Sequence, residues 1–152
     1  MKNSMLLTIC ASVATFATVA VGEVAPNEVV FTEAGAVETS MTGVAGDSAN
    51  GALVFKNRKK GNCLACHANA DMADQLFHGE IGPALDGVAS RYSENELRGL
   101  LVNSKMTFDG TMMPAFYVNE GFTRVMTKFE GRTNLTAQEV EDVLAYIQTL
   151  TE

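Results

Sequence analysis

The stretch "GNCLACH" at residues 61–67 decides the fold of this 152-residue chain, because it sets Cys63, Cys66 and His67 in the pattern Cys-x-x-Cys-His. Such a pattern is typical of a zinc site, a thiol redox pair or a covalent haem attachment site. A zinc site needs four ligands, usually two pairs, and beyond this stretch the chain has no second cysteine pair and one histidine, His78. A thioredoxin-like redox pair needs a strand–helix–strand context, which the sequence lacks.

Covalent haem attachment fits the stretch best. Each thiol can add across one vinyl group of the haem, and two residues between the cysteines match the spacing of the two vinyls. His67 then lies under the iron as the proximal ligand. Since the chain contains a single such pattern, we expect one covalently attached haem c, held by Cys63 and Cys66.

The sixth iron ligand must come from beyond His67, and the candidates are His78 and five methionines: Met72, Met106, Met112, Met113 and Met126. Most methionines in a domain of this kind pack in the core. Met113 is the preferred ligand because Pro114 follows it, and proline fixes an extended, rigid conformation at this point. Met112 is the alternative, and its side chain would point the opposite way in an extended stretch.

The string "IGPAL" at residues 81–85 indicates either a loop that orients the histidine ligand or a plain turn. A histidine that binds a metal usually donates its other ring N–H to a carbonyl or a carboxylate. The carbonyl of Pro83, in a stiff loop after Gly82, can accept that proton and orient His67.

The N-terminal residues 1–22 resemble an export signal. Lys2 is followed by a stretch without charges as far as Glu23, and small residues precede the expected cleavage after Gly22. A retained membrane anchor is the alternative, but the segment is short and diluted by Thr and Ser. Cleavage would remove Cys10 and deliver the protein to the periplasm.

The charge of the chain argues against nucleic acid and anionic membranes as partners. The net charge is −7, and without residues 1–22 ten basic and eighteen acidic residues remain, which gives −8. One basic cluster, residues 58–60, lies beside Cys63. It is either a docking site near the haem edge or a solvated helix end.

Residues 23–46 show little helical periodicity, and we expect an extended arm with a short strand around residues 29–32. The arm covers either the protein's own surface or a partner. Residues 47–152 are expected to be all-α. The sequence predicts a helix from Asp47 or Ser48 to about Asn57, with Ala52 and Phe55 inward, and capping boxes at residues 93–96 and 136–139.

Apolar residues at helical spacing follow both capping boxes, and they are Leu97, Leu100 and Leu101 after the first and Val140, Val143, Leu144, Ile147 and Leu150 after the second. A few short helices joined by long loops make little core of their own, so a large apolar cofactor should fill the middle of this domain.

Taken together, residues 47–152 resemble the class I c-type cytochromes. Gly51 and Phe55 are similar to the family's N-terminal helix, where a glycine lets the C-terminal helix approach, and Tyr146 is similar to the aromatic that meets it. The resemblance implies an all-α cytochrome c fold around one haem. It assigns "CLACH" to haem attachment, "GPAL", with Pro83 and Leu85, to the loop that orients the histidine, and "MPAF" to the methionine ligand.

Longer strings resemble the SoxX family of mono-haem subunits, among them "TGVAGDSANG", "NRKKGNCLACH", "IGPALDGVASRY", "TMMPAFY" and "LTAQEVEDVLAYIQTL". The resemblance implies a heterodimer with a SoxA-like monohaem or dihaem subunit, which carries out catalysis. It also implies a SoxYZ-like carrier protein, to whose cysteine thiosulfate is coupled oxidatively (an L-cysteine S-thiosulfotransferase activity), and a small acceptor cytochrome. No catalytic residue is expected in this chain.

Ligation by His67 and Met113 would leave the iron no open position, so the expected role is electron transfer. A thioether ligand raises the reduction potential. Two alternatives remain: a free-standing periplasmic cytochrome c that shuttles electrons, and a haem sensor with a displaceable sixth ligand. A shuttle has little use for the arm at residues 23–46.

Overall fold

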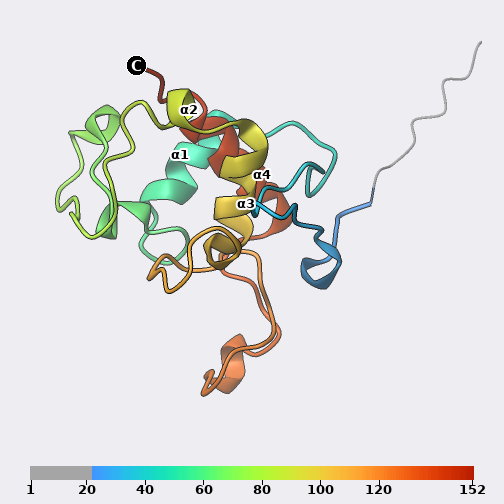
Figure 1. Ribbon diagram of the computed structural model, residues 1–152. Helices are drawn as coiled ribbons and strands as arrows, with labels where there is room; N and C mark the ends of the chain where they lie inside the picture. Colours follow the sequence, from blue (N-terminus) through green and yellow to red (C-terminus); the bar gives the residue numbers. More distant parts are fainter. Residues whose placement is uncertain (1–21) are drawn as a thin grey trace, which may run out of the picture.

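The computed structural model describes residues 22–152, so the expected export signal, apart from Gly22, lies outside the described residues. Those residues form helices joined by long loops and contain no strand, which confirms the all-α prediction (Figure 1). The elements are η1 (Pro26–Glu28), α1 (Ser48–Lys56), η2 (Cys63–Ala65), η3 (Ala70–Met72), α2 (Val88–Arg91), α3 (Glu94–Asn103), η4 (Ser104–Met106), η5 (Thr127–Phe129) and α4 (Ala137–Ile147).

Helices α1 and α4 cross at the centre of the molecule and pack against each other more closely than any other pair of helices (Figure 1). Gly51 makes this possible, because a Cβ placed on it would lie 1.9 Å from the carbonyl oxygen of Asp142 and 2.9 Å from Cβ of Tyr146. One turn further along α1, the rings of Phe55 and Tyr146 meet edge to face, with centroids 5.3 Å apart. The predicted glycine–aromatic contact between the first and last helices is therefore confirmed.

The predicted helix starts are confirmed by the side chains that cap them. Asp47 accepts hydrogen bonds from the amides of Ala49 and Asn50 at the start of α1. Complete capping boxes begin α3 and α4, where Ser93 and Thr136 each accept from the amide three residues on and the glutamate at that position reaches back. The apolar stripes of α3 and α4 face the core as predicted, with only Leu100 partly exposed.

The arm at residues 23–46 runs over the protein's own helices, and two of its side chains enter the core. Val37 and Met41 are 1% and 0% exposed. The short strand expected around residues 29–32 was wrong. The amides of Gly35 and Ala36 both bond to Thr32, to its carbonyl and its hydroxyl respectively, and this closes a turn.

Close backbone contacts fix the arm to α3 and α4. A Cβ on Gly99 of α3 would lie 2.0 Å from the carbonyl oxygen of Gly35, and a Cβ on Gly46 would lie 2.1 Å from that of Glu141. The outer face of the arm stays exposed, with Val30 at 80% and Val44 at 60%.

A second irregular segment, residues 118–134, projects from the body with η5 at its far end (Figure 1). Its two ends are joined where the amide of Leu135 donates to the carbonyl of Phe116 at 3.0 Å. No helix among residues 22–152 is long and apolar enough to cross a membrane.

Candidate haem site

The two cysteines of "GNCLACH" lie at the ends of the short helix η2. Asn62 enters the helix in a left-handed conformation, with φ of 49°, and the amides of Cys66 and His67 both donate to the carbonyl of Cys63, at 3.1 and 3.0 Å. Both thiols are free and half-buried. Burial raises the pKa of the Cys63 thiol to about 12, so this thiol is held neutral in an apolar setting.

His67 is held in one orientation by the loop that contains "IGPAL". Its Nδ1 lies 2.7 Å from the carbonyl oxygen of Pro83, which is the contact expected from the sequence. Because a carbonyl only accepts, Nδ1 is the protonated nitrogen, and the lone pair of Nε2 is available to a metal. Within residues 22–152, Nε2 forms no hydrogen bond.

Gly82 lets this loop pass directly behind the imidazole. A Cβ on Gly82 would lie 2.3 Å from Cε1 of His67, so any side chain there would displace the ring. The amide of Gly82 also donates to the carbonyl of Cys66 at 2.8 Å, and the amide of Leu85 donates to Ala68 at 2.9 Å. The loop and the Cys-x-x-Cys-His stretch are thus one unit.

The candidate methionines differ in their surroundings. Met72 is 5% exposed and belongs to the core, whereas Met106, Met112 and Met126 are 49%, 79% and 62% exposed. Met113 alone is partly buried and packed against the core. Met113, the preferred ligand, is therefore the candidate whose side chain is restricted by its surroundings. The side chain of its neighbour Met112 points away from the core.

The loop around Met113 is fastened to the end of α3. The hydroxyl of Ser104 donates to the carbonyl of Met113 at 2.9 Å, and the Lys105 ammonium reaches the same carbonyl. Two residues beyond Pro114, the amide of Phe116 donates to Leu101 at 3.2 Å. These bonds fix the backbone at Met113. None of them involves the thioether of Met113.

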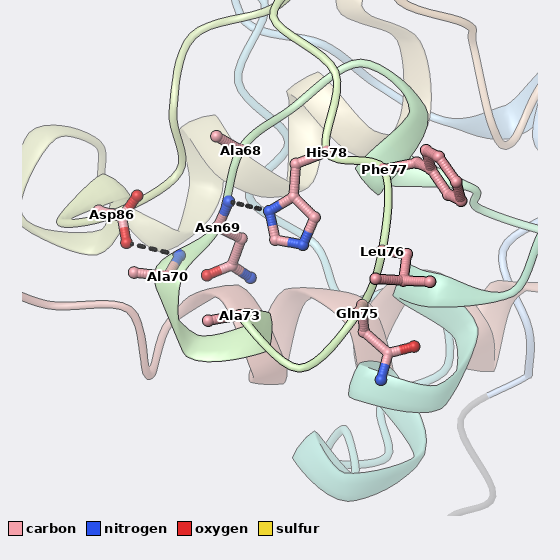
Figure 2. Close-up of a pocket in the computed structure, with 9 residues that line it drawn as sticks. All are labelled: Ala68, Asn69, Ala70, Ala73, Gln75, Leu76, Phe77, His78 and Asp86. Atoms are coloured by element: carbon pink, nitrogen blue, oxygen red, sulfur yellow. Dashed lines mark hydrogen bonds between the residues drawn. The ribbon is translucent and has the colours of Figure 1, made fainter.

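Both ring nitrogens of His78 have backbone partners. Its Nδ1 accepts from the amide of Asn69 at 3.3 Å, as Figure 2 shows. Its Nε2 lies 3.1 Å from the carbonyl oxygen of Met72. A depression of about 440 Å³ surrounds His78. Neither His67 nor Met113 lines it, and its lining residues all lie between positions 68 and 86, after "GNCLACH".

Sequence reasoning missed the network that joins this segment to α4. Asn69, 1% exposed, donates through its amide group to the hydroxyl of Tyr146 at 2.9 Å, and that hydroxyl donates to Asp71 at 2.8 Å. Burial first, and Asp71 second, raise the pKa of Tyr146 well above its usual range. An asparagine two residues after the histidine was the only signal in the sequence.

The residues of this region fit a haem c. Two thiols at the correct spacing, an oriented imidazole with a free Nε2 and a restricted thioether are the groups that would attach such a haem and bind its iron. Leu85, half-buried against the core, supplies an apolar wall near His67. Large apolar side chains are also exposed in the loops of residues 76–108, as suits an apolar macrocycle, and they include Leu76, Phe77, Ile81 and Phe108.

The basic cluster at residues 58–60 is only partly available for docking. All three residues are exposed, but Lys60 forms an ion pair with Glu139 at the start of α4, whereas Arg58 and Lys59 form none within residues 22–152. Lys56 lies in the last turn of α1, where a cation favours the helix dipole. The helix-end interpretation therefore fits Lys56, which precedes the cluster, whereas Lys60 is accounted for by its ion pair, and the docking hypothesis now concerns Arg58 and Lys59.

Comparisons with known proteins agree with this geometry. Residues 48–151 match the family model described as "Cytochrome c". A chain of the crystal structure of SoxXA from P. pantotrophus is 45% identical, with a TM-score of 0.81, and the match covers 86% of this chain and 100% of that chain. No curated protein sequence matches the chain.

Proposed function

Since the chain belongs to the cytochrome c family, whose members carry covalent haem c, we propose that it is the electron-transfer subunit, with a single haem, of a periplasmic SoxAX-type complex. The observation that carries this proposal is the 45% identity over the whole of a SoxXA chain. The match takes in 86% of this chain, a larger share than residues 48–151, so it also includes sequence outside the cytochrome domain.

We propose the following roles for the residues of the site. The thiols of Cys63 and Cys66 form thioethers with the two vinyl groups, and His67 binds the iron through Nε2. The Pro83 carbonyl, 2.7 Å from Nδ1, makes the imidazole a stronger donor and fixes its plane. When bound, the haem supplies an iron centre that takes up and releases one electron.

Met113 occupies the sixth position in this proposal, and Met112 is the alternative. The part-buried side chain of Met113 loses little freedom on binding iron, whereas the 79% exposed Met112 would have to leave solvent and reverse its direction. A thioether ligand and burial of the macrocycle would both raise the potential, since both favour the ferrous state. If His67 and Met113 both held the iron, the haem would supply electron transfer, and the chain would offer no place at the iron for a substrate.

The sulfur chemistry would then belong to the partner. We propose a heterodimer with a SoxA-like subunit, in which a complex with L-cysteine S-thiosulfotransferase activity couples thiosulfate oxidatively to a cysteine of a SoxYZ-like carrier. The electrons leave through this chain to a small acceptor cytochrome. The exposed outer face of the arm, with Val30 and Val44, is a candidate contact for the partner, while its inner face binds α3 and α4.

Export is part of the same proposal, with residues 1–22 cleaved as a signal. Haem c attachment to Cys63 and Cys66 takes place on the far side of the inner membrane, which suits the periplasm.

Co-expression with a tagged SoxA-like subunit in a host that matures c-type cytochromes tests the proposal. We expect the two chains to copurify and elute together as a heterodimer, with one haem found on this chain by intact mass. A monomer that exchanges electrons normally and shows no affinity for the partner would instead establish a free-standing shuttle. Rapid carbon monoxide binding by the reduced wild-type protein, at a rate that Met113→Ala does not increase, would indicate a haem sensor.

A further inference from the structure

Tyr117 lies four residues beyond Met113 and is almost completely buried, at 2% exposure. Its backbone amide donates to the carbonyl of Val102 in α3 at 3.1 Å. Together with the Ser104 hydroxyl bond to Met113, this contact fastens one side of the methionine loop, residues 111–117, to the end of α3.

The side chain of Tyr117 reaches in the other direction, to the start of the arm. Its hydroxyl lies 2.7 Å from the carbonyl oxygen of Val24 and 3.1 Å from a carboxylate oxygen of Glu23. Both groups accept, so the hydroxyl is the donor. Burial, followed by the bond to Glu23, raises the pKa of Tyr117 to about 12, and the hydroxyl therefore keeps its proton at neutral pH.

The contact continues through the arm into α4. The amide of Val24 donates to the carbonyl of Met41 at 2.8 Å, and the amide of Met41 donates to Glu141 Oε1 at 2.6 Å. A continuous series of hydrogen bonds thus joins the methionine loop to the last helix, although the participating residues are far apart in sequence.

Glu141 is itself held in place, which makes the far end of this series rigid. Arg98 Nε donates to the Glu141 carboxylate at 3.1 Å, and both side chains are at most 5% exposed. Arg98 also donates to the carbonyl of Val37 in the arm at 3.2 Å. Moving the arm would take the Val37 carbonyl from Arg98 and the Met41 amide from Glu141, and leaving buried polar groups with unmade hydrogen bonds is costly.

We propose that Tyr117 is a positioning residue for the sixth ligand, and that Glu23 and Val24 form a tether that holds the methionine loop against the domain. The inference rests on the proposed role of Met113. Without the hydroxyl, only the hydrogen bonds to α3 hold the loop, so these bonds open more often, and states in which Met113 is away from the iron become more populated.

The test compares Tyr117→Phe with Tyr92→Phe in the full-length holoprotein. Tyr92 is half-buried against the core, and its hydroxyl forms no hydrogen bond within residues 22–152, so it is a matched control. Two quantities are measured: hydrogen exchange at the backbone amides of positions 116 and 117, and the rate of carbon monoxide binding to the reduced protein. For Tyr117→Phe we expect both to rise about tenfold, the effect of losing one buried hydrogen bond, and no change for Tyr92→Phe.

A second variant guards against a folding defect in Tyr117→Phe. It deletes residues 23–26 and joins the export signal directly to residue 27, which removes the tether and keeps the Tyr117 ring. We expect the same rise in both quantities. Values within twofold of wild type in the deletion variant would overturn the inference, as would a rise in exchange without faster carbon monoxide binding.

The two measurements also separate this inference from the assignment of Met113. Hydrogen exchange reports on the tether whichever side chain binds the iron. If Met113→Ala leaves the spectrum unchanged, the ligand assignment fails, and unchanged exchange at positions 116 and 117 would show separately that the tether fails.

Discussion

The imidazole Nδ1 of His67 lies 2.7 Å from the carbonyl oxygen of Pro83, and Gly82 passes directly behind the ring. His67 belongs to "GNCLACH" and Pro83 to "IGPAL", yet the two strings form one unit. Because Nδ1 faces the Pro83 carbonyl, Nε2 faces away from this loop.

Gly82→Ala is expected to displace the imidazole, because the new methyl would lie 2.3 Å from Cε1 of His67. The shift should weaken iron ligation and lower the yield of holoprotein, measured as haem absorbance per protein. Ala84→Ser, at an exposed position two residues on, is the control. A normal yield and an unchanged spectrum for Gly82→Ala would contradict the described fit.

Gly51→Ala should force α1 and α4 apart, since a Cβ there would lie 1.9 Å from the carbonyl oxygen of Asp142. Overpacking of this kind costs about 1–3 kcal/mol in the free energy of unfolding, measurable by denaturant titration of the holoprotein. Ala49→Ser, on the exposed side of the same helix, should change it little. Equal effects of the two substitutions would speak against close contact of the helices.

The stability of the protein is expected to fall in acid through Asp142. Burial alone would raise the pKa of this carboxyl, but hydrogen bonds from the Asp47 amide, Gln138 and Asn50 outweigh burial and lower it. A lowered folded-state pKa means that the stabilisation is complete above the unfolded value of about 3.9 and is lost as pH falls through the folded value. Unfolding measured from about pH 6 to about pH 2 checks this.

Asp142→Asn should be less stable than wild type at neutral pH and should lose less stability in acid. Asp109→Asn, at an exposed site with no hydrogen bond to the side chain within residues 22–152, serves as the control and should follow the wild-type curve. Parallel curves for wild type and Asp142→Asn would exclude Asp142 as a source of the acid sensitivity.

The features of the fold that could be predicted from the sequence are those that depend on residues close together in the chain. The capping boxes at Ser93 and Thr136, the apolar stripe of α4 and the Gly51–Tyr146 contact follow from spacing along the chain. The course of the arm does not, because it depends on pairing between residues about a hundred positions apart, such as Met41 with Glu141. A charged residue inside the apolar pattern of each helix, Arg98 and Glu141, was the available hint.

The site shows the same division. The haem attachment pattern and the Pro83 contact could be expected from short strings. In contrast, the hydrogen bond from Tyr117 to Val24 could not be predicted, since no local sequence pattern indicates which distant group a tyrosine hydroxyl will bond.

The double variant Arg58→Glu, Lys59→Glu tests the docking hypothesis that remains after Lys60 is assigned to Glu139. If these side chains guide an acidic partner, electron transfer to the acceptor cytochrome should slow several-fold at low ionic strength, and the difference should vanish at high salt. Arg124→Glu, Arg132→Glu in the projecting segment is the control of equal charge change. Identical rates and salt dependence in both variants would discard the docking role.

The most direct test of the whole account is the midpoint potential and the weak sulfur-to-iron absorption band of Met113→Ala, measured beside Met112→Ala. The account predicts that Met113→Ala abolishes the band and lowers the potential by on the order of 0.1 V, while Met112→Ala leaves both as in wild type. If both variants retain the wild-type band and potential, neither methionine binds the iron, and the proposed site of electron transfer is contradicted.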